Sequence, residues 1–465
     1  MGIFDALNTS VAGLQAQSYA LQNISGNIAN AQTSGYKGVS TRFVDLVPDA
    51  TNQDRQIAGG VTAFSQATIS SQGTVSASSI GTYMAINGDG FFSVQKPSAQ
   101  VDGLPVFNSV TDYTRRGDFQ VNSNGNLING AGYYLMGVPV DAKSGNPLGN
   151  VPNVLQFQNN FVPAQPTSTV QYSLNLPATP TTTAASSAAV GTVASQGGLT
   201  PSDFSVDPTI TGTGTVVAND TQVFQNESVS GGAITAYDAT GTPVNLQLRW
   251  AKTDSSTLGG SHVDAWNLFY QSNPTAIGSA VSWTNSGTNF TFATDGKLTS
   301  PSGASITLAN VKVGGQSLGN LAFNFGSGGL SQYASSTGAT TINTISQNGY
   351  AAGQLQSVSV SNTGLVVGTF SNGQNINLAS VTLSRFNGTN YLKSLDGGAY
   401  ALTDESGPAI AGAAGSISGS SLEGSNTDIA DEFTKLIVTQ QAYSANTKVI
   451  TTANTMVQDL LNVLR

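Results

Sequence analysis

Apolar residues recur every seven positions at both ends of the chain, and a helical period is strongest there. Near the start the apolar stripe consists of Leu7, Leu14, Leu21 and Ile28, with Phe4, Val11 and Ile24 beside it. Near the end it consists of Ile429, Leu436, Tyr443, Ile450, Val457 and Leu464, with Phe433, Leu460 and Leu461 beside it. Sustained seven-residue spacing is typical of coiled coils. We therefore predict helices over residues 1–30 and 423–465 that pair with each other.

The second predicted helix has a start signal, because Ser425 is followed three residues later by Asp428, as in a capping box. The first carries no charged residue between positions 6 and 30. Amides cover its remaining faces where a solvated helix would carry charges. We therefore expect this helix to be contacted on several sides, as in an array of subunits.

One stripe alone favours an ordinary amphipathic helix packed on its own domain, but two stripes at opposite ends favour pairing and polymerisation. We therefore assign subunit assembly to the stripe residues and to two amides of the first helix. These residues are Leu7, Val11, Leu14, Leu21, Asn27, Ile28, Asn30, Ile429, Phe433, Leu436, Tyr443, Ile450, Val457 and Leu464.

Between the two helices the apolar period changes to two, with Asn-Gly and Gly-rich turns that are typical of antiparallel hairpins. Strand segments surround the turns at Asn87-Gly88, Asn124-Gly125 and Asn372-Gly373, and residues 244–250 form a further strand candidate. The fold class is therefore mostly β with helical termini, a nested plan with antiparallel β domains outside a helical coiled coil. We expect a helix over 1–30, a linker over 31–74, an inner β domain from 75–146 plus 346–422, an inserted outer β domain over 147–345 with one or two subdomains, and a helix over 423–465.

Composition excludes several classes of function. Charged residues make up 9% of the 465 residues, and the net charge is −9, so no basic stripe for nucleic acid is expected. With no cysteine and only His262, we expect neither metal nor cofactor. The sequence contains no run of 18 apolar residues, so we expect no membrane insertion. Its first residues lack the pattern of a cleaved signal peptide.

Three short motifs point to other functions, but their context does not support them. Residues 315–319 match a nucleophile elbow, yet that arrangement places its histidine after the serine and His262 precedes it. Arg116-Gly117-Asp118 spells an adhesion tripeptide at a predicted strand start, where a structural role is favoured. Asn8 fits a glycosylation acceptor but lies within the predicted helix. We therefore expect no enzyme activity.

Both terminal regions contain distinctive motifs: residues 23–30 (NISGNIAN) and 33–37 (TSGYK) near the start, and residues 422–428 (LEGSNTD), 440–446 (QQAYSAN) and 449–453 (VITTA) near the end. The first set resembles the N-terminal signature of the bacterial flagellar rod and hook proteins, and the second set resembles the C-terminal signature of that family. Residues 88–92, 113–119 and 349–353 are similar to core segments of the hook members. The resemblance covers roughly 1–147 and 345–465.

The resemblance implies a structural subunit of a curved, flexible tube, the flagellar hook, that transmits torque from rod to filament. It also implies partners: further copies of the chain, the distal rod protein, the hook cap, the hook-associated junction protein and the flagellar export apparatus. Export would then need no cleavable signal peptide and would place the protein outside the cell. The alternatives are another axial subunit, such as a distal rod or hook-associated protein, and a secreted adhesive or enzymatic β protein.

Overall fold

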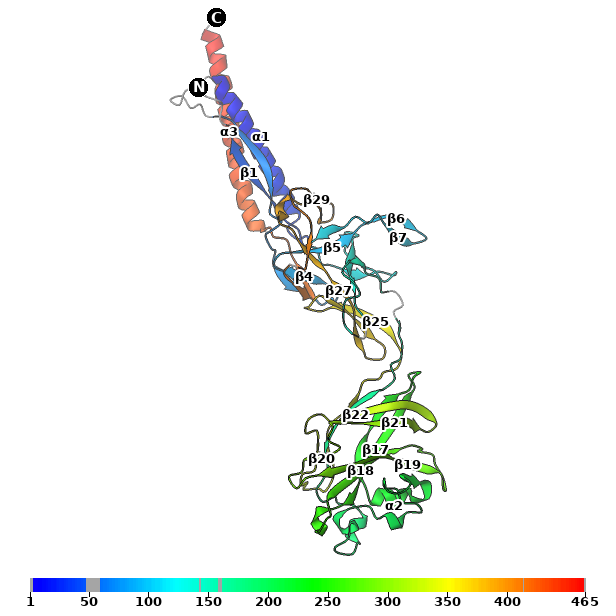
Figure 1. Ribbon diagram of the computed structural model, residues 1–465. Helices are drawn as coiled ribbons and strands as arrows, with labels where there is room; N and C mark the ends of the chain where they lie inside the picture. Colours follow the sequence, from blue (N-terminus) through cyan, green and yellow to red (C-terminus); the bar gives the residue numbers. More distant parts are fainter. Residues whose placement is uncertain (1–2, 47–58, 142–143, 158–160, 413, 464–465) are drawn as a thin grey trace. The chain divides into compact units, whose positions relative to one another are not determined.

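The computed structural model describes residues 3–46, 59–141, 144–157, 161–412 and 414–463. Two compact units divide the chain: residues 1–160 with 355–465 form the first unit, and residues 161–354 form the second unit. Each unit is mostly β, and the two long helices belong to the first (Figure 1). The prediction of a mostly β chain with helical termini is confirmed. Leu464 lies outside the described residues.

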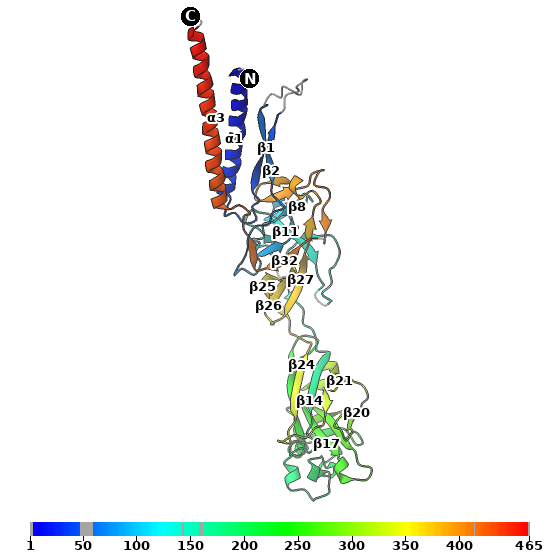
Figure 2. The same cartoon turned by 90° about the vertical axis from the view of Figure 1, so that its left-hand side faces the viewer.

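The two long helices are α1 (Ile3–Ala29) and α3 (Ile429–Val463), which lie side by side in antiparallel directions (Figure 2). Asp428 begins α3, since its carboxylate accepts hydrogen bonds from the backbone N–H groups of Ala430 at 2.7 Å and Asp431 at 3.4 Å. The capping residue is thus Asp428 and not Ser425, whose hydroxyl bonds Thr427 instead. An Asx side chain at this position satisfies the free N–H groups of the first turn.

Residues 31–74, which the sequence predicts as a linker, contain an antiparallel hairpin. Strand β1 (Val39–Asp45) pairs with β2 (Val61–Ala67) over seven residue pairs. One face of the hairpin lies on α1, where Asn23 Nδ2 donates to Thr41 Oγ1 at 2.9 Å and Tyr19 shares a 2.7 Å hydrogen bond with Ser65. Because neither strand has a buried face of its own, the sequence carries only a weak strand signal there.

The main sheet of the first unit contains strands from both of its segments, residues 1–160 and 355–465, which we call the two arms of the chain. Its order is β25 (Gly353–Val360), β26 (Leu365–Phe370), β27 (Asn375–Val381), β11 (Tyr134–Pro139), β5 (Phe91–Gln95), β8 (Asp112–Thr114), β30 (Ala399–Ala401), β29 (Lys393–Leu395). Shorter strands complete it: β9 (Gln120–Val121), β10 (Leu127–Ile128), β12 (Asn153–Val154), β28 (Leu383–Arg385) and β31 (Ile410–Ala411). Three separate pairs are β3 (Val75–Ala77) with β33 (Ser421–Glu423), β4 (Met84–Asn87) with β32 (Ser416–Gly419), and β6 (Pro97–Val101) with β7 (Leu104–Phe107).

The second unit consists of two sheets that share one apolar core. One sheet contains β21 (Ser305–Val313), β22 (Gln316–Asn324), β14 (Thr169–Asn175), β23 (Leu330–Ser331) and β24 (Thr341–Gln347). The other contains β15 (Thr215–Val217), β19 (Val281–Phe292), β18 (Asp264–Gln271), β17 (Pro243–Asp254), β16 (Val229–Tyr237) and β20 (Leu298–Ser300). Tyr172, Trp250 and Phe323 are fully buried in the shared core. The short helix α2 (Thr221–Asn226) covers a second cluster, and β13 (Phe161–Val162) pairs with the first residues of β25.

The boundaries of the insertion differ from the predicted 147–345 at both ends. Strand β12 pairs with β11, and Leu155 and Phe157 are buried in the core of the first unit. At the other end β24 pairs with β14, so it belongs to the second unit. The polar, charge-free run after residue 150 therefore contains strand β12 (Asn153–Val154), which its composition does not predict and which pairs with β11 in the first unit.

The predicted turns at Asn124-Gly125 and Asn372-Gly373 are confirmed, since they join β9 to β10 and β26 to β27. Both glycines have positive φ, 77° and 78°, which glycine adopts without strain. The turn at Asn87-Gly88 does not close a hairpin: β4 pairs with β32, and β5 pairs with β8, β11 and β28. A local turn signal cannot report such pairing between distant segments.

A buried carboxyl group predicts how the second unit responds to pH. Glu227 is 3% exposed and accepts the N–H of Thr200 at 2.8 Å. Burial, together with the nearby carboxyl of Asp203, raises the pKa of Glu227 to about 7 from an ordinary value of 4.5. Because the folded state favours the protonated form of Glu227, this carboxyl contributes to the stability of the second unit below about pH 4.5. That contribution is lost as the pH rises to about 7.

We therefore expect the urea midpoint of the second unit to decrease as the pH is raised from 4.5 to 7.5. In the Glu227→Gln variant the part of this decrease that comes from Glu227 should be absent. All three tryptophans, Trp250, Trp266 and Trp283, lie in the second unit, so tryptophan fluorescence follows this unit alone. Identical pH profiles for the parent chain and the variant would contradict the assignment to Glu227.

Candidate functional site

The contact between α1 and α3 has one antiparallel register, which two contacts define. Asn27 Nδ2 donates a 3.1 Å hydrogen bond to Glu432 Oε2. At Gly13, a Cβ atom would lie 2.9 Å from Nδ2 of Asn446. Asn27 and Gly13 are fourteen residues apart, and so are Glu432 and Asn446. Both contacts therefore belong to the same register, with one further layer halfway between them.

We call the helix seam the six residues that meet in these three layers. Each is small or polar, and five of them are buried while Asn446 is half-buried. The seam consists of Asn27, Ala20 and Gly13 on α1 and of Glu432, Thr439 and Asn446 on α3. Small residues let two helix backbones approach closely, so this seam is held by close contact and polar pairs more than by large apolar side chains.

The apolar stripes predicted from the sequence flank the helix seam. The structure leaves Leu7, Leu14, Leu21 and Ile28 of α1, and Leu436, Ile450 and Val457 of α3, half-buried. It exposes Val11, Ile429, Phe433 and Tyr443. Of the two predicted amides, Asn27 is buried, and Asn30 is half-buried with its side chain bonded to Gly26 O at 3.0 Å. The stripe residues are therefore available, wholly or in part, for other contacts.

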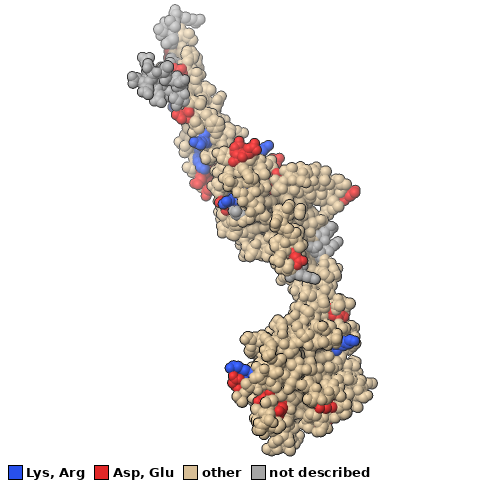
Figure 3. Space-filling view, in the orientation of Figure 1, with Lys and Arg blue, Asp and Glu red and all other residues tan. Residues whose placement is uncertain are grey.

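Sequence reasoning missed further exposed apolar residues on α3, because they do not repeat at seven-residue spacing with the stripe. They are Ile437, Val438, Val449 and Met456, and Leu461, which the sequence places beside the stripe, is exposed as well. These residues lie on several sides of the helix. The face of the first unit that Figure 3 shows carries few charged side chains. Large exposed apolar surfaces on a folded protein mark interaction sites. The helix pair is thus a candidate surface for assembly.

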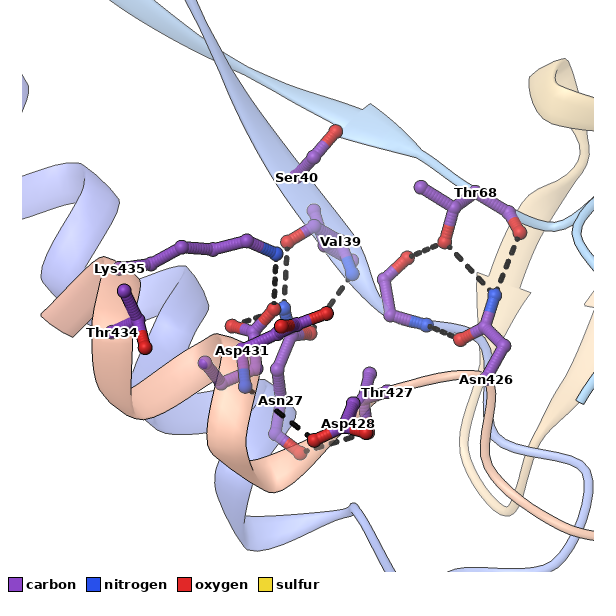
Figure 4. A network of polar contacts seen from close by, with 12 residues as sticks. Asn27, Val39, Ser40, Thr68, Asn426, Thr427, Asp428, Asp431, Thr434 and Lys435 are labelled. Carbon is purple, nitrogen blue, oxygen red and sulfur yellow. Dashed lines mark hydrogen bonds and ion pairs between the residues drawn. The ribbon is translucent and has the colours of Figure 1, made fainter.

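The base of the helix pair is fixed by a polar network around Asn27 (Figure 4). The Asn27 side chain accepts the N–H of Val39 at 2.9 Å and donates to the carbonyl of Val39 at 3.0 Å, so it pairs with β1 as a strand residue would. Lys435 Nζ bonds Glu432 Oε1 at 2.6 Å. One amide therefore joins α1, β1 and α3.

A second amide, Asn426, joins the segment before α3 to the hairpin. Its Oδ1 accepts the N–H of Gly38 at 2.7 Å, and its Nδ2 donates to the carbonyl and hydroxyl oxygens of Thr68, both at 3.1 Å. A side chain at Gly38 would collide with Thr427, since its Cβ would lie 2.5 Å from Cγ2. The close passage of residues 37–38 past 426–427 explains why glycine occupies this position.

A cavity of about 410 Å³ lies among α1, β1 and the first turns of α3. Its lining combines apolar groups, such as Ile24 and Phe43, with the acidic residues Asp428, Asp431 and Glu432. The side chains of Asn27, Asp428 and Glu432 in this lining already have hydrogen-bond partners within the chain. The cavity therefore belongs to the packing of the helix base, and we assign no ligand to it.

Beside this base, three charged side chains form a buried group that we call the Glu423 cluster: Lys37, Arg115 and Glu423. Lys37 Nζ lies 2.5 Å from Glu423 Oε1, and Arg115 Nη1 lies 3.3 Å from Glu423 Oε2. The side chains of Lys37 and Glu423 are 0% exposed, and that of Arg115 is 2% exposed. The residues come from three separate segments: the one after α1, the one after β8, and β33. The cluster thus connects the two arms of the chain.

Further bonds extend the Glu423 cluster. Lys37 Nζ donates to Ser71 O at 2.6 Å, and Arg115 Nη2 donates to Gly88 O at 2.8 Å. The backbone N–H of Gly73 donates to Glu423 Oε1 at 2.9 Å. The cluster contains two cationic groups and one carboxylate. Burial lowers the pKa of Lys37 despite its bond to Glu423, because the low-dielectric surroundings disfavour the ammonium form.

The network at the helix base predicts a specific effect for an isosteric change. Asn27→Asp replaces two donated hydrogen bonds, to Val39 O and Glu432 Oε2, with repulsion between oxygen atoms. We expect a loss of about 2–4 kcal/mol in the unfolding free energy of the first unit, because a buried charge is left without its partners. The measurement is denaturant unfolding followed by helical circular dichroism.

Asn30→Asp is the matched control for Asn27→Asp. Its amide donates to Gly26 O and accepts from Thr33 Oγ1, both close in the described sequence, so we expect a loss below about 1 kcal/mol. Equal losses in the two variants would show that Asn27 has no special role in joining α1, β1 and α3.

The motifs considered for other functions have ordinary surroundings. His262 is exposed, and its Nδ1 lies 2.7 Å from Asp254 Oδ1. Gly315 and Gly319 have positive φ around a hairpin between β21 and β22. Arg116 forms a bidentate ion pair with Asp118 at 2.7 and 2.8 Å. In the described residues, no helix has the length and apolar character to cross a membrane.

Comparison with known protein families gives three matches that follow the chain in order. Residues 85–195 match the family described as flagellar hook protein FlgE/F/G D1 domain, and residues 205–350 match flagellar basal body protein FlaE D2 domain. Residues 418–463, which include Glu423 and α3, match flagellar basal body rod FlgEFG protein C-terminal. The chain belongs to the flagellar rod and hook axial protein family.

Relatives within this family align with the chain from end to end. The flagellar hook protein FlgE of Brucella suis biovar 1 is 29% identical over 473 residues, covering 100% of both chains. That of Salmonella typhimurium is 27% identical over 468 residues, covering 98% of this chain and 100% of the other. The crystal structure of Helicobacter pylori flagellar hook protein FlgE2 has 15% identity and a TM-score of 0.48, and it covers 74% of this chain and 98% of that chain.

Proposed function

We propose that this member of the rod and hook family is the structural subunit of the flagellar hook. In this role it polymerises into a curved, flexible tube that transmits torque from the rod to the filament. The observation that carries the proposal is the end-to-end similarity to proteins named flagellar hook protein, which includes the large inserted unit. A shared length and a shared insertion distinguish this assignment from similarity restricted to the terminal segments.

The exposed apolar residues of the helix pair support polymerisation as the mechanism. Phe433, Ile437 and Val438 are 50%, 53% and 60% exposed, so burying the exposed part of each would contribute about 1 kcal/mol. Together with the exposed residues Val449, Met456 and Leu461 they lie on more than one side of α3, so one partner cannot cover them all. Neighbouring copies of the same chain, each contributing an α1–α3 pair, would provide that cover.

The Glu423 cluster supports torque transmission within one subunit. It connects the base of the helix pair to the sheet of the first unit through buried ion pairs and backbone hydrogen bonds. Such a connection resists rotation of the helices against the sheet better than a single backbone strand would. We infer that force applied to the helix pair reaches the β structure through this cluster.

We further propose the chain's partners and location. Besides copies of itself, the subunit would contact the distal rod protein at one end of the tube and a hook cap or junction protein at the other. It would leave the cell through the flagellar export apparatus, without a cleavable signal peptide, and it would have no enzymatic role. Another axial position, such as the distal rod, is the second candidate, because the C-terminal match is to a rod family.

Electron microscopy of basal bodies from a strain that lacks this gene separates the two candidates. We expect complete rods that end without a hook, and restoration of curved hooks when the gene is supplied. Rods that end short of their normal length would favour a rod subunit instead. Hooks of normal form in the deletion strain would contradict both assignments.

A further inference from the structure

We propose that Gly13 and Asn446 are positioning residues that hold α1 and α3 at one register and one separation, far from the anchored base of the pair. The contact lies fourteen residues from the Asn27–Glu432 hydrogen bond, which corresponds to about 21 Å along a helix. This role concerns a single chain, and it does not depend on the proposed place of the protein in the hook.

The base of the helix pair is anchored, but the anchors do not extend along the helices. The hydrogen bonds of Asn27 fix the end of α1 to β1 and to the first turn of α3. Between Ala20 and Gly13 on α1, and between Thr439 and Asn446 on α3, the geometry of these described residues contains no hydrogen bond or ion pair from one helix to the other. A second fixed point is therefore needed to keep the distal halves of the helices together in one arrangement.

The apolar stripes cannot provide this fixed point. Leu7, Leu14 and Leu21 repeat every seven residues, and so do Leu436, Tyr443 and Ile450. A shift of one helix by seven residues, about 10 Å, brings equivalent stripe residues opposite each other again. Polar or unusual residues at single positions are what set the register of such helices.

Gly13 is the position that distinguishes the observed register. A Cβ there would lie 2.9 Å from Nδ2 of Asn446 and 3.2 Å from both its Cγ and Oδ1, so the amide occupies the space that a side chain would fill. A shift by seven residues would place Asn446 against Ala6 or Ala20, which carry methyl groups at the same position. The shift would also separate Glu432, a buried carboxylate, from its donor Asn27.

Fixing this register also fixes the directions of the exposed apolar residues. Val11 on α1 and Val449 on α3 lie two and three residues from the Gly13–Asn446 contact, and both are exposed. A displaced or splayed pair would present these groups in different relative positions. Gly13 and Asn446 thus act on the outer surface indirectly, by holding the two helices that carry it.

The absence of cysteine from the chain allows a direct test by disulfide trapping in the monomeric full-length protein. Ala20→Cys with Thr439→Cys places two thiols in the middle layer of the helix seam. Ala20→Cys with Ala453→Cys places them two heptads apart and leaves Gly13 and Asn446 unchanged. We expect the first pair to oxidise at least tenfold faster. Equal rates, or no oxidation of either pair, would overturn the proposal of a single fixed register.

Gly13→Leu, introduced into the Ala20→Cys and Thr439→Cys chain, tests the contact itself. Leucine has the higher helix propensity, so a change that acted only on α1 would favour the helix. We expect instead a tenfold or greater loss of trapping, because the leucine meets Asn446. The matched control is Gly26→Leu in the same helix, where a Cβ would have nothing within 4 Å, and trapping should persist.

Rescue completes the test. Adding Asn446→Gly to Gly13→Leu exchanges the large and small residues across the contact, and we expect trapping to return to within about threefold of the parent pair. Because glycine weakens α3 on its own, recovery would not follow from helix propensity. Unchanged trapping in Gly13→Leu, or failure of the exchange to restore it, would overturn the positioning role.

Discussion

Glu423→Gln should destabilise the first unit by about 3–5 kcal/mol, because it leaves two cations, Lys37 and Arg115, buried without a carboxylate. The substitution preserves shape, removes the charge and turns one of the two accepting oxygens into an NH2 group that cannot accept from Lys37 or Arg115. Helical circular dichroism follows this unit, since both long helices belong to it. Tryptophan fluorescence, which follows the second unit alone, should show an unchanged midpoint.

Lys37→Met is the informative companion to Glu423→Gln. It leaves one cation and one carboxylate, Arg115 and Glu423, and removes a lysine whose pKa is already lowered by burial. The variant still loses the hydrogen bond to Ser71 O, so we expect a loss of about 1–2 kcal/mol. A Lys37→Met loss equal to or larger than that of Glu423→Gln would contradict the view that the carboxylate is the centre of the cluster.

Ile437→Asp should raise the critical concentration for polymerisation at least about a hundredfold, since burial of one isoleucine contributes about 1.5–3 kcal/mol and a buried carboxylate costs more. Ile437 is 53% exposed, so the unfolding free energy of the monomer should change by less than about 0.5 kcal/mol. Sedimentation of the polymer against total protein measures the critical concentration.

Val190→Asp is the control for Ile437→Asp, because Val190 is 99% exposed and lies in the second unit. We expect its critical concentration to stay within about threefold of the parent value. Loss of polymerisation in both variants would indicate a general effect of added charge. Normal polymerisation of Ile437→Asp would remove this face of α3 from the assembly surface.

Much of the fold follows from local sequence patterns, and the failures have a common cause. The terminal helices, the strand over residues 244–250 and the turns at Asn124 and Asn372 depend on neighbouring residues, and the structure confirms them. The hairpin β1–β2 and the strand β12 do not, because their burial comes from distant partners. The pattern of apolar and polar residues in one segment does not indicate which distant segment will pack against it.

The candidate site shows the same limit. The sequence indicates segments containing Lys37, Arg115 and Glu423, but nothing in it places side chains 386 positions apart in one buried ion cluster. The apolar stripes likewise predict that α1 and α3 pair, but the helix seam itself is small and polar. The helix seam does have a pattern in the sequence, because its residues are spaced seven apart on each helix. They are Gly13, Ala20 and Asn27 on α1 and Glu432, Thr439 and Asn446 on α3.

In the polymer, we expect neighbouring subunits to cover the outer apolar faces of the helix pair. A single Ile437→Cys substitution, in a chain that otherwise contains no cysteine, reports this cover through its rate of reaction with a maleimide. Mixing a trace of this variant with excess parent chain keeps the polymer intact. We predict that polymerisation slows labelling at least a hundredfold relative to the monomer, and labelling at the same rate in polymer and monomer would contradict the account.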